Sequence, residues 1–341
     1  MLGLLGSLER MGDCADTLGV GGVYVDPLWR IEVALLPVEQ QLLRSWWVRR
    51  LGFIAHAGAA SITTTQSYSR LEHSLGLLAL VANFSPQDAT TRVTALLHDV
   101  GHLPFSHTLE GLAALNHHEL GRGRIRSLAP ILHAHGIDAD EVIATDTGVR
   151  PSVLHSRKGG MKLDHLDSFV RSGQAHGRTM TPPAALLSRL RVVDGTVDTD
   201  ASTADELVVL VAGEARAQRS TANVLPVTVL RHAVNLLLQA SDGPSPSQIA
   251  VMTDDELWAA LLGHPDTAPH ARRIREEPQS FQLLTPNDAS VLDDGMHERP
   301  THSITRGYLD LPTVDEAPIT SETITSLHRA LPLSFAIGEA L

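Results

Sequence analysis

Histidines and carboxylates are concentrated over residues 68–118 in a pattern that could bind a metal ion. His98 and Asp99 close an apolar run, so an imidazole and a carboxylate lie at the end of an expected buried helix. Buried polar and charged groups are costly unless they are paired or bound to a metal. Neighbouring helical residues point about 100° apart, so these two side chains reach one ion from different sides, and further ligands have to come from other helices. His73 and Asp164 are the candidates.

Two histidines and two carboxylates make a mixed nitrogen and oxygen site, which suits Mn²⁺, Fe²⁺, Ni²⁺, Co²⁺ or Zn²⁺ rather than Ca²⁺. A bound metal lowers the pKa of its water and polarises a phosphoryl oxygen, as the hydrolysis of a phosphate ester or anhydride requires. Nearby His102, His107 and His118 can hold phosphate oxygens or protonate the leaving group. Arg70, one turn before His73, can grip a phosphate through its planar guanidinium.

Helices have to bring these residues together. The apolar spacing predicts a helix over residues 70–83, on which Arg70 and His73 share a face. Other helices are expected over residues 32–51, 86–98, 128–135, 161–172, 203–219, 223–240, 253–263 and 321–331, and a short one carrying His107. Strands are expected over 304–312, near 19–26 and on both sides of a tight turn at Asp194-Gly195. The fold class is therefore mostly α, with many helices and a minor β-hairpin.

Size and composition exclude several classes of function. A chain of 341 residues can bury a large core. The net charge of −12 argues against a general nucleic-acid-binding surface, which needs a basic stripe. An apolar run of about 20 residues, long enough to cross a bilayer, is not apparent, so no membrane partner is expected. The single cysteine, Cys14, excludes an internal disulfide and fits a reducing cytoplasm.

Six short motifs, taken in order, resemble those of the HD-domain phosphohydrolases: Arg70-Leu-Glu-His73, His98-Asp99, Gly101-His102, His107, His118-Glu119 and Leu163-Asp164. They are most similar to the deoxynucleoside-triphosphate triphosphohydrolase branch, which includes the vertebrate sterile-alpha-motif and HD protein. A His-Asp pair alone would be weak support, and the ordered set carries the resemblance. It covers roughly residues 22–262.

The resemblance implies an HD-domain fold with its catalytic core over residues 22–262, a lead-in over 1–21 and a less regular extension over 263–341. It implies four ligands for a divalent transition metal: His73, His98, Asp99 and Asp164. It also implies that His107 protonates the leaving oxygen and that His102, His118 and Arg70 hold the phosphate. The substrate would be a small phosphorylated molecule, a nucleotide. Relatives of this branch often assemble, so the resemblance allows a homo-oligomer.

Several positions depart from the pattern of that branch. The sequence Asp-Lys-Trp-Asp-Tyr of the branch is replaced after Asp164, so that His165 stands for the lysine and Ser168 for the substrate-stacking tyrosine. Ser172 stands for a sugar-contacting aspartate, and Arg50 for a glutamine. The metal centre is kept while the nucleotide-binding residues change. We therefore expect a phosphohydrolase with an altered substrate pocket, in which Arg50 and His165 are candidate substrate contacts.

Several assignments have a simpler alternative. The arginines around Arg50 can form a solvated helix face, and His117 is expected to face solvent. Asp167 is expected to pair with Arg171 rather than to bind the metal. Two other functions stay open. One is a non-catalytic, regulatory nucleotide-binding protein. The other is a di-iron oxygenase, in which His102 would supply a ligand, with His118, to a second iron.

Overall fold

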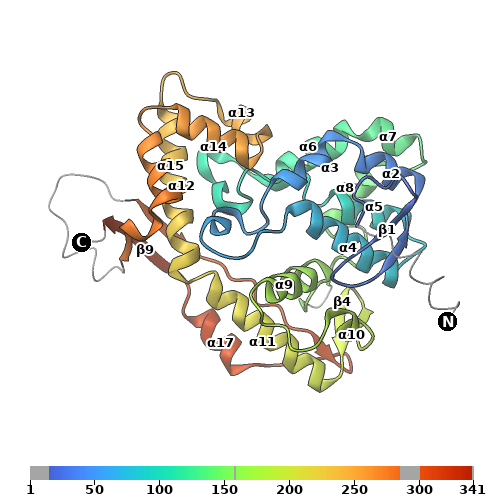
Figure 1. Cartoon of the computed structure of the whole chain (residues 1–341). Coiled ribbons are helices and arrows are strands. Elements are labelled where there is room, and N and C mark those ends of the chain that lie inside the picture. The colour runs from blue at the N-terminus through green and yellow to red at the C-terminus, as the bar shows by residue number, and fades with distance from the viewer. Residues whose placement is uncertain (1–14, 157–158, 285–299, 340–341) are drawn as a thin grey trace, which may run out of the picture.

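The computed structural model describes residues 15–156, 159–284 and 300–339 (Figure 1). The model is 53% helical, and its described residues contain 15 α-helices and a few small strands, which confirms the mostly α fold class. Of the predicted lead-in over residues 1–21, the first 14 residues, with Cys14, lie outside the described residues.

The α-helices are α2 Pro37–Leu43, α3 Trp46–Arg50, α4 Arg70–Phe84, α5 Ala89–Leu97, α6 His117–Ser127, α7 Ala129–His133, α8 Ala139–Asp146, α9 Leu163–Ala175, α10 Pro183–Leu187, α11 Ala201–Ala217, α12 Thr221–Gln239, α13 Pro246–Val251, α14 Asp254–Gly263, α15 Ala268–Glu276 and α17 Glu322–Arg329. Short 3₁₀ helices lie between them: η1 Leu51–Phe53, η2 Gly58–Ile62, η3 His107–Leu109, η4 Leu112–Ala114 and η5 Pro278–Ser280.

The strands form three small sheets. β1 Val23–Val25 pairs with β2 Glu32–Ala34. The order of the second sheet is β3-β4-β7-β8, made of Arg191–Val193, Thr196–Thr199, Thr313–Val314 and Ala317–Pro318. The order of the third is β5-β9-β6, made of Phe281–Leu284, Leu333–Glu339 and Thr301–Ile304. Because β7 pairs with β4, the C-terminal segment is joined to the predicted hairpin of the core.

α4 lies at the centre of the fold, and its capping fixes where the site begins. Ser69 accepts a hydrogen bond from the backbone of Glu72, whose side chain bonds back to the backbone of Ser69. This capping box starts the helix at Arg70, which puts Arg70 and His73 on its first turn. Beyond them the helix is apolar on all sides and packs against α5 and α9, as a fully buried helix requires.

Two predicted elements differ in the structure. Residues 32–34 form β2 rather than the start of a helix, because their backbone pairs with β1 in a hairpin. The predicted strand over 304–312 is wrong: β6 ends at Ile304, and the chain then runs without regular structure to β7. The turn at Asp194-Gly195 is confirmed, since both residues have the positive φ angles that such a tight turn needs.

α12 is the one helix of the described chain that is long and apolar enough, by length and composition, to cross a membrane. In the fold it packs against η2, α15 and the strands of the third sheet. Val229, Leu230 and Val234 on this helix are buried. These contacts are those of a core helix.

Candidate metal and phosphate site

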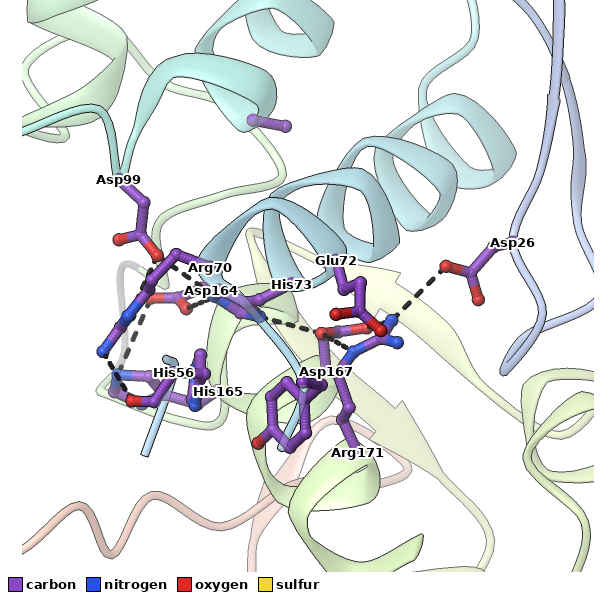
Figure 2. A network of polar contacts seen from close by, with 12 residues as sticks. Asp26, His56, Arg70, Glu72, His73, Asp99, Asp164, His165, Asp167 and Arg171 are labelled. Carbon is purple, nitrogen blue, oxygen red and sulfur yellow. Dashed lines mark hydrogen bonds and ion pairs between the residues drawn. The ribbon is translucent and has the colours of Figure 1, made fainter. Parts of the chain in front are cut away.

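The four predicted metal ligands come together from three helices. His73 comes from the first turn of α4, His98 and Asp99 follow α5, and Asp164 comes from the first turn of α9. The Nε2 atom of His73 lies 3.1 Å from Asp164 Oδ1 and 3.3 Å from His98 Nε2. His98 Nε2 lies 3.3 Å from Asp99 Oδ1. Figure 2 shows Asp99, Asp164 and His73 beside Arg70.

The orientation of both histidines fits metal binding. His98 Nδ1 donates to the carbonyl oxygen of Ala95 at 2.8 Å, and His73 Nδ1 donates to Asp167 Oδ2 at 2.8 Å. Each ring therefore presents Nε2 to the common centre. Metal-bound histidines commonly have their other nitrogen held in this way. Neighbouring ligands about 2.1 Å from one ion lie about 3 Å apart, close to the spacing of these atoms. His73, His98 and Asp99 thus fit a divalent cation, and Asp164 lies against His73 as the predicted fourth ligand.

When no cation is bound, neighbouring positive groups compensate the negative charge of the carboxylates. Burial alone would raise the pKa of Asp99, but Arg70, His98 and His102 hold that pKa well below its usual range. Burial lowers the pKa of His73, but hydrogen bonds to Asp164 and Asp167 outweigh this and raise it to about 9. In the absence of metal, a proton on His73 therefore neutralises part of the negative charge.

Metal binding should therefore compete with this proton. Up to a pH of about 9, His73 carries a proton that the metal has to displace, so we expect metal affinity to increase by up to about tenfold per pH unit between pH 6.5 and 9. The stability of the metal-free protein should fall over the same window, by at most about 3 kcal/mol, because the raised pKa stabilises the fold only while His73 is protonated. Titration calorimetry with Mn²⁺ in buffers of different ionisation enthalpy would measure the released proton. Metal affinity that is independent of pH between 7 and 9 would contradict the expectation.

A buried ion-pair network supports His73 from the side opposite the metal centre. Asp167 accepts hydrogen bonds from His73, from Trp29 Nε1 at 2.7 Å and from Arg171 at 2.9 Å. Arg171 also contacts Asp26 at 3.3 Å (Figure 2). A Cβ at Gly76 would lie 2.1 Å from Arg171 Nη2, so only glycine leaves room for this network against α4. As predicted, Asp167 pairs with Arg171, and it also orients His73.

Arg70 is bound to Asp99 rather than extended into open space. Its Nη1 atom lies 2.8 Å from Asp99 Oδ2, and its Nε donates to Ser106 Oγ at 2.6 Å. Arg70 is 5% exposed. Its predicted phosphate contact stays a prediction. What the structure adds is that Arg70 fixes the position of Asp99 and of the loop at Ser106.

That loop has a strained backbone. Phe105 and Ser106 both have positive φ angles, which residues other than glycine rarely adopt. The loop is held from outside, because the backbone N–H of Phe105 donates to Asp254 at the start of α14 at 2.6 Å. Such strain persists only where surrounding contacts enforce it, and it is common at functional sites. Here it sets the direction of the chain just before His107.

A second group of histidines lies beside the metal centre. His102 Nε2 is 3.0 Å from Asp99 Oδ1, which joins the two groups. The ring of His102 stacks on that of His117 at 4.5 Å and meets His107 edge-on at 4.7 Å. His117 Nδ1 bonds to Glu110 Oε2 at 2.7 Å. Ligand atoms of His102, His107 and His117 lie within 4.8 Å of one another.

His117 differs from its expectation in the structure, and the predicted phosphate contact of His118 stays a prediction. The side chain of His117, expected to face solvent, is 11% exposed and joins the second group, while His118 is exposed. The reason is the close approach of α6, since a Cβ at Gly101 would lie 1.9 Å from the carbonyl oxygen of His117. His118 instead lines a neighbouring cavity of about 390 Å³, with Asp146 on its wall.

Two further residues of this region, Asp146 and His56, could not be identified as site residues from the sequence. Asp146 lines the same cavity as His118, and burial raises its pKa to about 6. His56 lies 4.8 Å from the ring of His73, and its Nε2 atom is buried without a hydrogen-bond partner. Each stands alone in a stretch without a recognisable motif.

The two candidate substrate contacts have different surroundings. Arg50 is fully buried and donates only to backbone carbonyls, those of His102, Ala250, Val251 and Met252. It therefore closes the C-terminal end of α13 and cannot face a substrate, which corrects the prediction. His165 stays at the site: its Nε2 lies 3.8 Å from Asp164 Oδ2, and its Nδ1 bonds to Asp310.

Comparison with known proteins agrees with the geometry. Residues 70–189 match the HD domain family. The chain is 28% identical over 194 residues to a metal-dependent phosphohydrolase, cns2, of Cordyceps militaris, covering 54% of this chain and 53% of that protein. It is 29% identical over 155 residues to the uncharacterized protein MJ1154 of Methanocaldococcus jannaschii, covering 42% of this chain and 33% of that protein. The chain thus spans from one third to about half the length of these relatives.

Solved structures show the same fold over nearly the whole chain. A phosphohydrolase from Bacteroides thetaiotaomicron superposes with a TM-score of 0.69 at 16% identity, covering 94% of this chain and 100% of that one. A hypothetical protein from Aquifex aeolicus superposes with a TM-score of 0.68 at 18% identity, covering 92% and 95%. The segment that matches the HD domain family, residues 70–189, includes all four predicted metal ligands.

Proposed function

We propose that this HD-domain protein is a metal-dependent hydrolase of a nucleotide or a nucleotide-like phosphate ester. The observation that carries the proposal is the grouping of His73, His98 and Asp99, with Asp164 bonded to His73, next to a group of further histidines. Its single cysteine fits a cytoplasmic location.

In the proposed reaction, different side chains bind the cation and position its ligands. His73, His98, Asp99 and Asp164 would hold the cation. The cation, when bound, would lower the pKa of a water molecule and polarise a phosphoryl oxygen. Arg70 holds Asp99 in place, and His102 donates to the same carboxylate.

His107 is the proposed proton donor to the leaving oxygen. Its ring keeps access to solvent, but crowding by the protein, together with His102 and Arg70, lowers its pKa well below 6.5. His107 is therefore neutral at pH 7 without substrate. A phosphate dianion bound beside the ring would favour the protonated form, so that His107 would gain its proton as the substrate arrives.

A triphosphohydrolase-type reaction is the specific form that we propose, with a pocket different from that of the deoxynucleoside-triphosphate branch. Ser168 and Ser172 on α9 support a difference in the pocket, because a serine cannot provide the aromatic or carboxylate contact that the resemblance implies at these positions. Ser172 is instead bonded to Gln66, Arg178 and Glu214 within the protein.

The test is a panel of nucleoside mono-, di- and triphosphates incubated with the purified protein and Mn²⁺. We expect release of phosphate, pyrophosphate or triphosphate from at least one member, and loss of that release with a chelator. The identity of the product would show which bond is cut. Absence of any release across the panel, with metal bound, would overturn the proposal in favour of a nucleotide-binding regulatory protein.

A second candidate, an iron-dependent oxygenase with two metals, is favoured by one observation. His102, His107 and His117 form a second group able to hold a cation, and Asp99 contacts both groups. Metal analysis of protein purified without chelators would separate the two functions. Two irons per chain and consumption of oxygen would favour the oxygenase, whereas one divalent ion and phosphate release would favour the hydrolase.

A further inference from the structure

The C-terminal segment places an aromatic residue beside the site. Between β6 and β7 the chain runs past α9, and the ring of Tyr308 lies 5.2 Å from that of His165 in an edge-on contact. The same ring lies 6.4 Å from that of His107. Since His165 follows the ligand Asp164 and His107 belongs to the second histidine group, Tyr308 lies between the metal side and the leaving-group side of the site.

Several contacts fix this segment on the core. The backbone N–H of Met161 donates to the carbonyl oxygen of Leu311 at 2.8 Å, two residues before α9 begins. Asp310 bonds to His165, and β7 pairs with β4 directly afterwards. Leu309 and Leu311 pack against the main core. These contacts therefore hold Tyr308 beside the site, although it lies far from the predicted ligands along the chain.

The chemical surroundings of Tyr308 suit a neutral organic group next to a phosphate. The guanidinium of Arg306 lies over the ring at 5.3 Å, and the charges of Arg70, Asp164 and Glu110 also act on the phenol. Burial raises its pKa, so the hydroxyl stays neutral. Among the residues that the structure describes, this hydroxyl has no hydrogen-bond partner.

We propose that Tyr308 is a substrate-binding residue that contacts the part of the substrate beyond the cleaved phosphate. The inference rests on the proposed function, in which phosphorus lies at the metal centre and the leaving oxygen faces His107. Whatever is attached to that oxygen then extends past His107 toward Tyr308. An aromatic ring with a free hydroxyl and a nearby guanidinium suits a nucleoside, through its base or its sugar.

Two phosphonates that cannot be hydrolysed test this contact in the full-length protein loaded with Mn²⁺. Methylphosphonate probes the metal and histidine side alone, and a phosphonate analogue of adenosine 5′-monophosphate also reaches Tyr308. We expect Tyr308→Ala to weaken binding of the adenosine compound about tenfold or more and binding of methylphosphonate less than about twofold. Tyr308→Phe should retain most of the affinity because it keeps the ring. Titration calorimetry measures each value.

Phe281→Ala is the matched control, because Phe281 also carries a guanidinium over its ring, that of Arg273 at 4.6 Å, but lies in the third sheet. This variant should bind both compounds like the wild type. If the wild type hydrolyses a nucleotide while Tyr308→Ala binds the adenosine compound as tightly as the wild type, the inference about Tyr308 alone is overturned. An equal loss for both phosphonates would overturn it too. If the wild type binds neither compound and hydrolyses no nucleotide, the proposed function fails.

Discussion

Replacing Asp99 with asparagine is expected to reduce turnover by more than about 1,000-fold and to abolish tight metal binding. Asp99 is the carboxylate on which the site converges, with Arg70 at 2.8 Å, His102 at 3.0 Å and His98 at 3.3 Å. Asparagine keeps the size but removes the charge. Several kcal/mol of transition-state stabilisation depend on the metal, and each 1.4 kcal/mol changes the rate about tenfold. Turnover and Mn²⁺ affinity are the two measurements.

The fold should survive Asp99→Asn but be less stable, because Arg70 keeps a buried charge without its partner. Circular dichroism would show whether the helix content is retained. Asp88→Asn is the matched control. Asp88 caps the other end of α5, and asparagine is an equally good cap, so metal binding and turnover should be unchanged. Tight metal binding by Asp99→Asn would remove Asp99 from the ligand set.

Replacing Asp167 with alanine is expected to lower the free energy of unfolding by about 3–5 kcal/mol and metal affinity by about 10–100-fold. Asp167 is fully buried and compensates the buried guanidinium of Arg171, so its loss leaves that charge with Asp26 alone. It also holds Nδ1 of His73, so that ring would lose the orientation that presents Nε2 to the metal. Urea unfolding and calorimetric titration with Mn²⁺ measure the two effects separately.

Asp140→Ala is the control for stability. Asp140 forms an exposed ion pair with Arg126 at 3.5 Å, and such pairs contribute at most about 1 kcal/mol. Asp167→Asn divides the two roles, since the amide retains an acceptor for Trp29 but not the charge. If Asp167→Ala binds metal as tightly as the wild type while unfolding more easily, then Asp167 acts on stability and has no part in orienting His73.

The residues of the candidate metal site could be predicted to lie near one another because local rules place each of them. A capping box starts α4 one turn before His73, and the apolar run of α5 ends at His98 and Asp99. Asp164 lies on the first turn of a helix whose apolar spacing is clear in the sequence. Each position depends on helix periodicity and ends, which are properties of short segments.

The surroundings of that centre could not be predicted in the same way. His117 and His118 are adjacent on α6, and which of them turns inward depends on the contact of α6 with Gly101. Arg50 lies in a stretch that reads as an exposed helix face, but three of the four carbonyls it binds belong to residues about 200 positions later. Tyr308 lies in a proline-rich quarter with weak periodicity. All three depend on contacts between distant segments.

The hydrogen bond from the backbone of Phe105 to Asp254 has a consequence for protein engineering. The HD domain match stops at residue 189, yet the loop before His107 takes its shape from the start of α14 and from the arginine that closes α13. The segment 70–189 grafted into another scaffold would carry all four predicted ligands, but it would lack the contacts from Asp254 and Arg50. A transplanted version should therefore retain affinity for a cation more readily than rate enhancement.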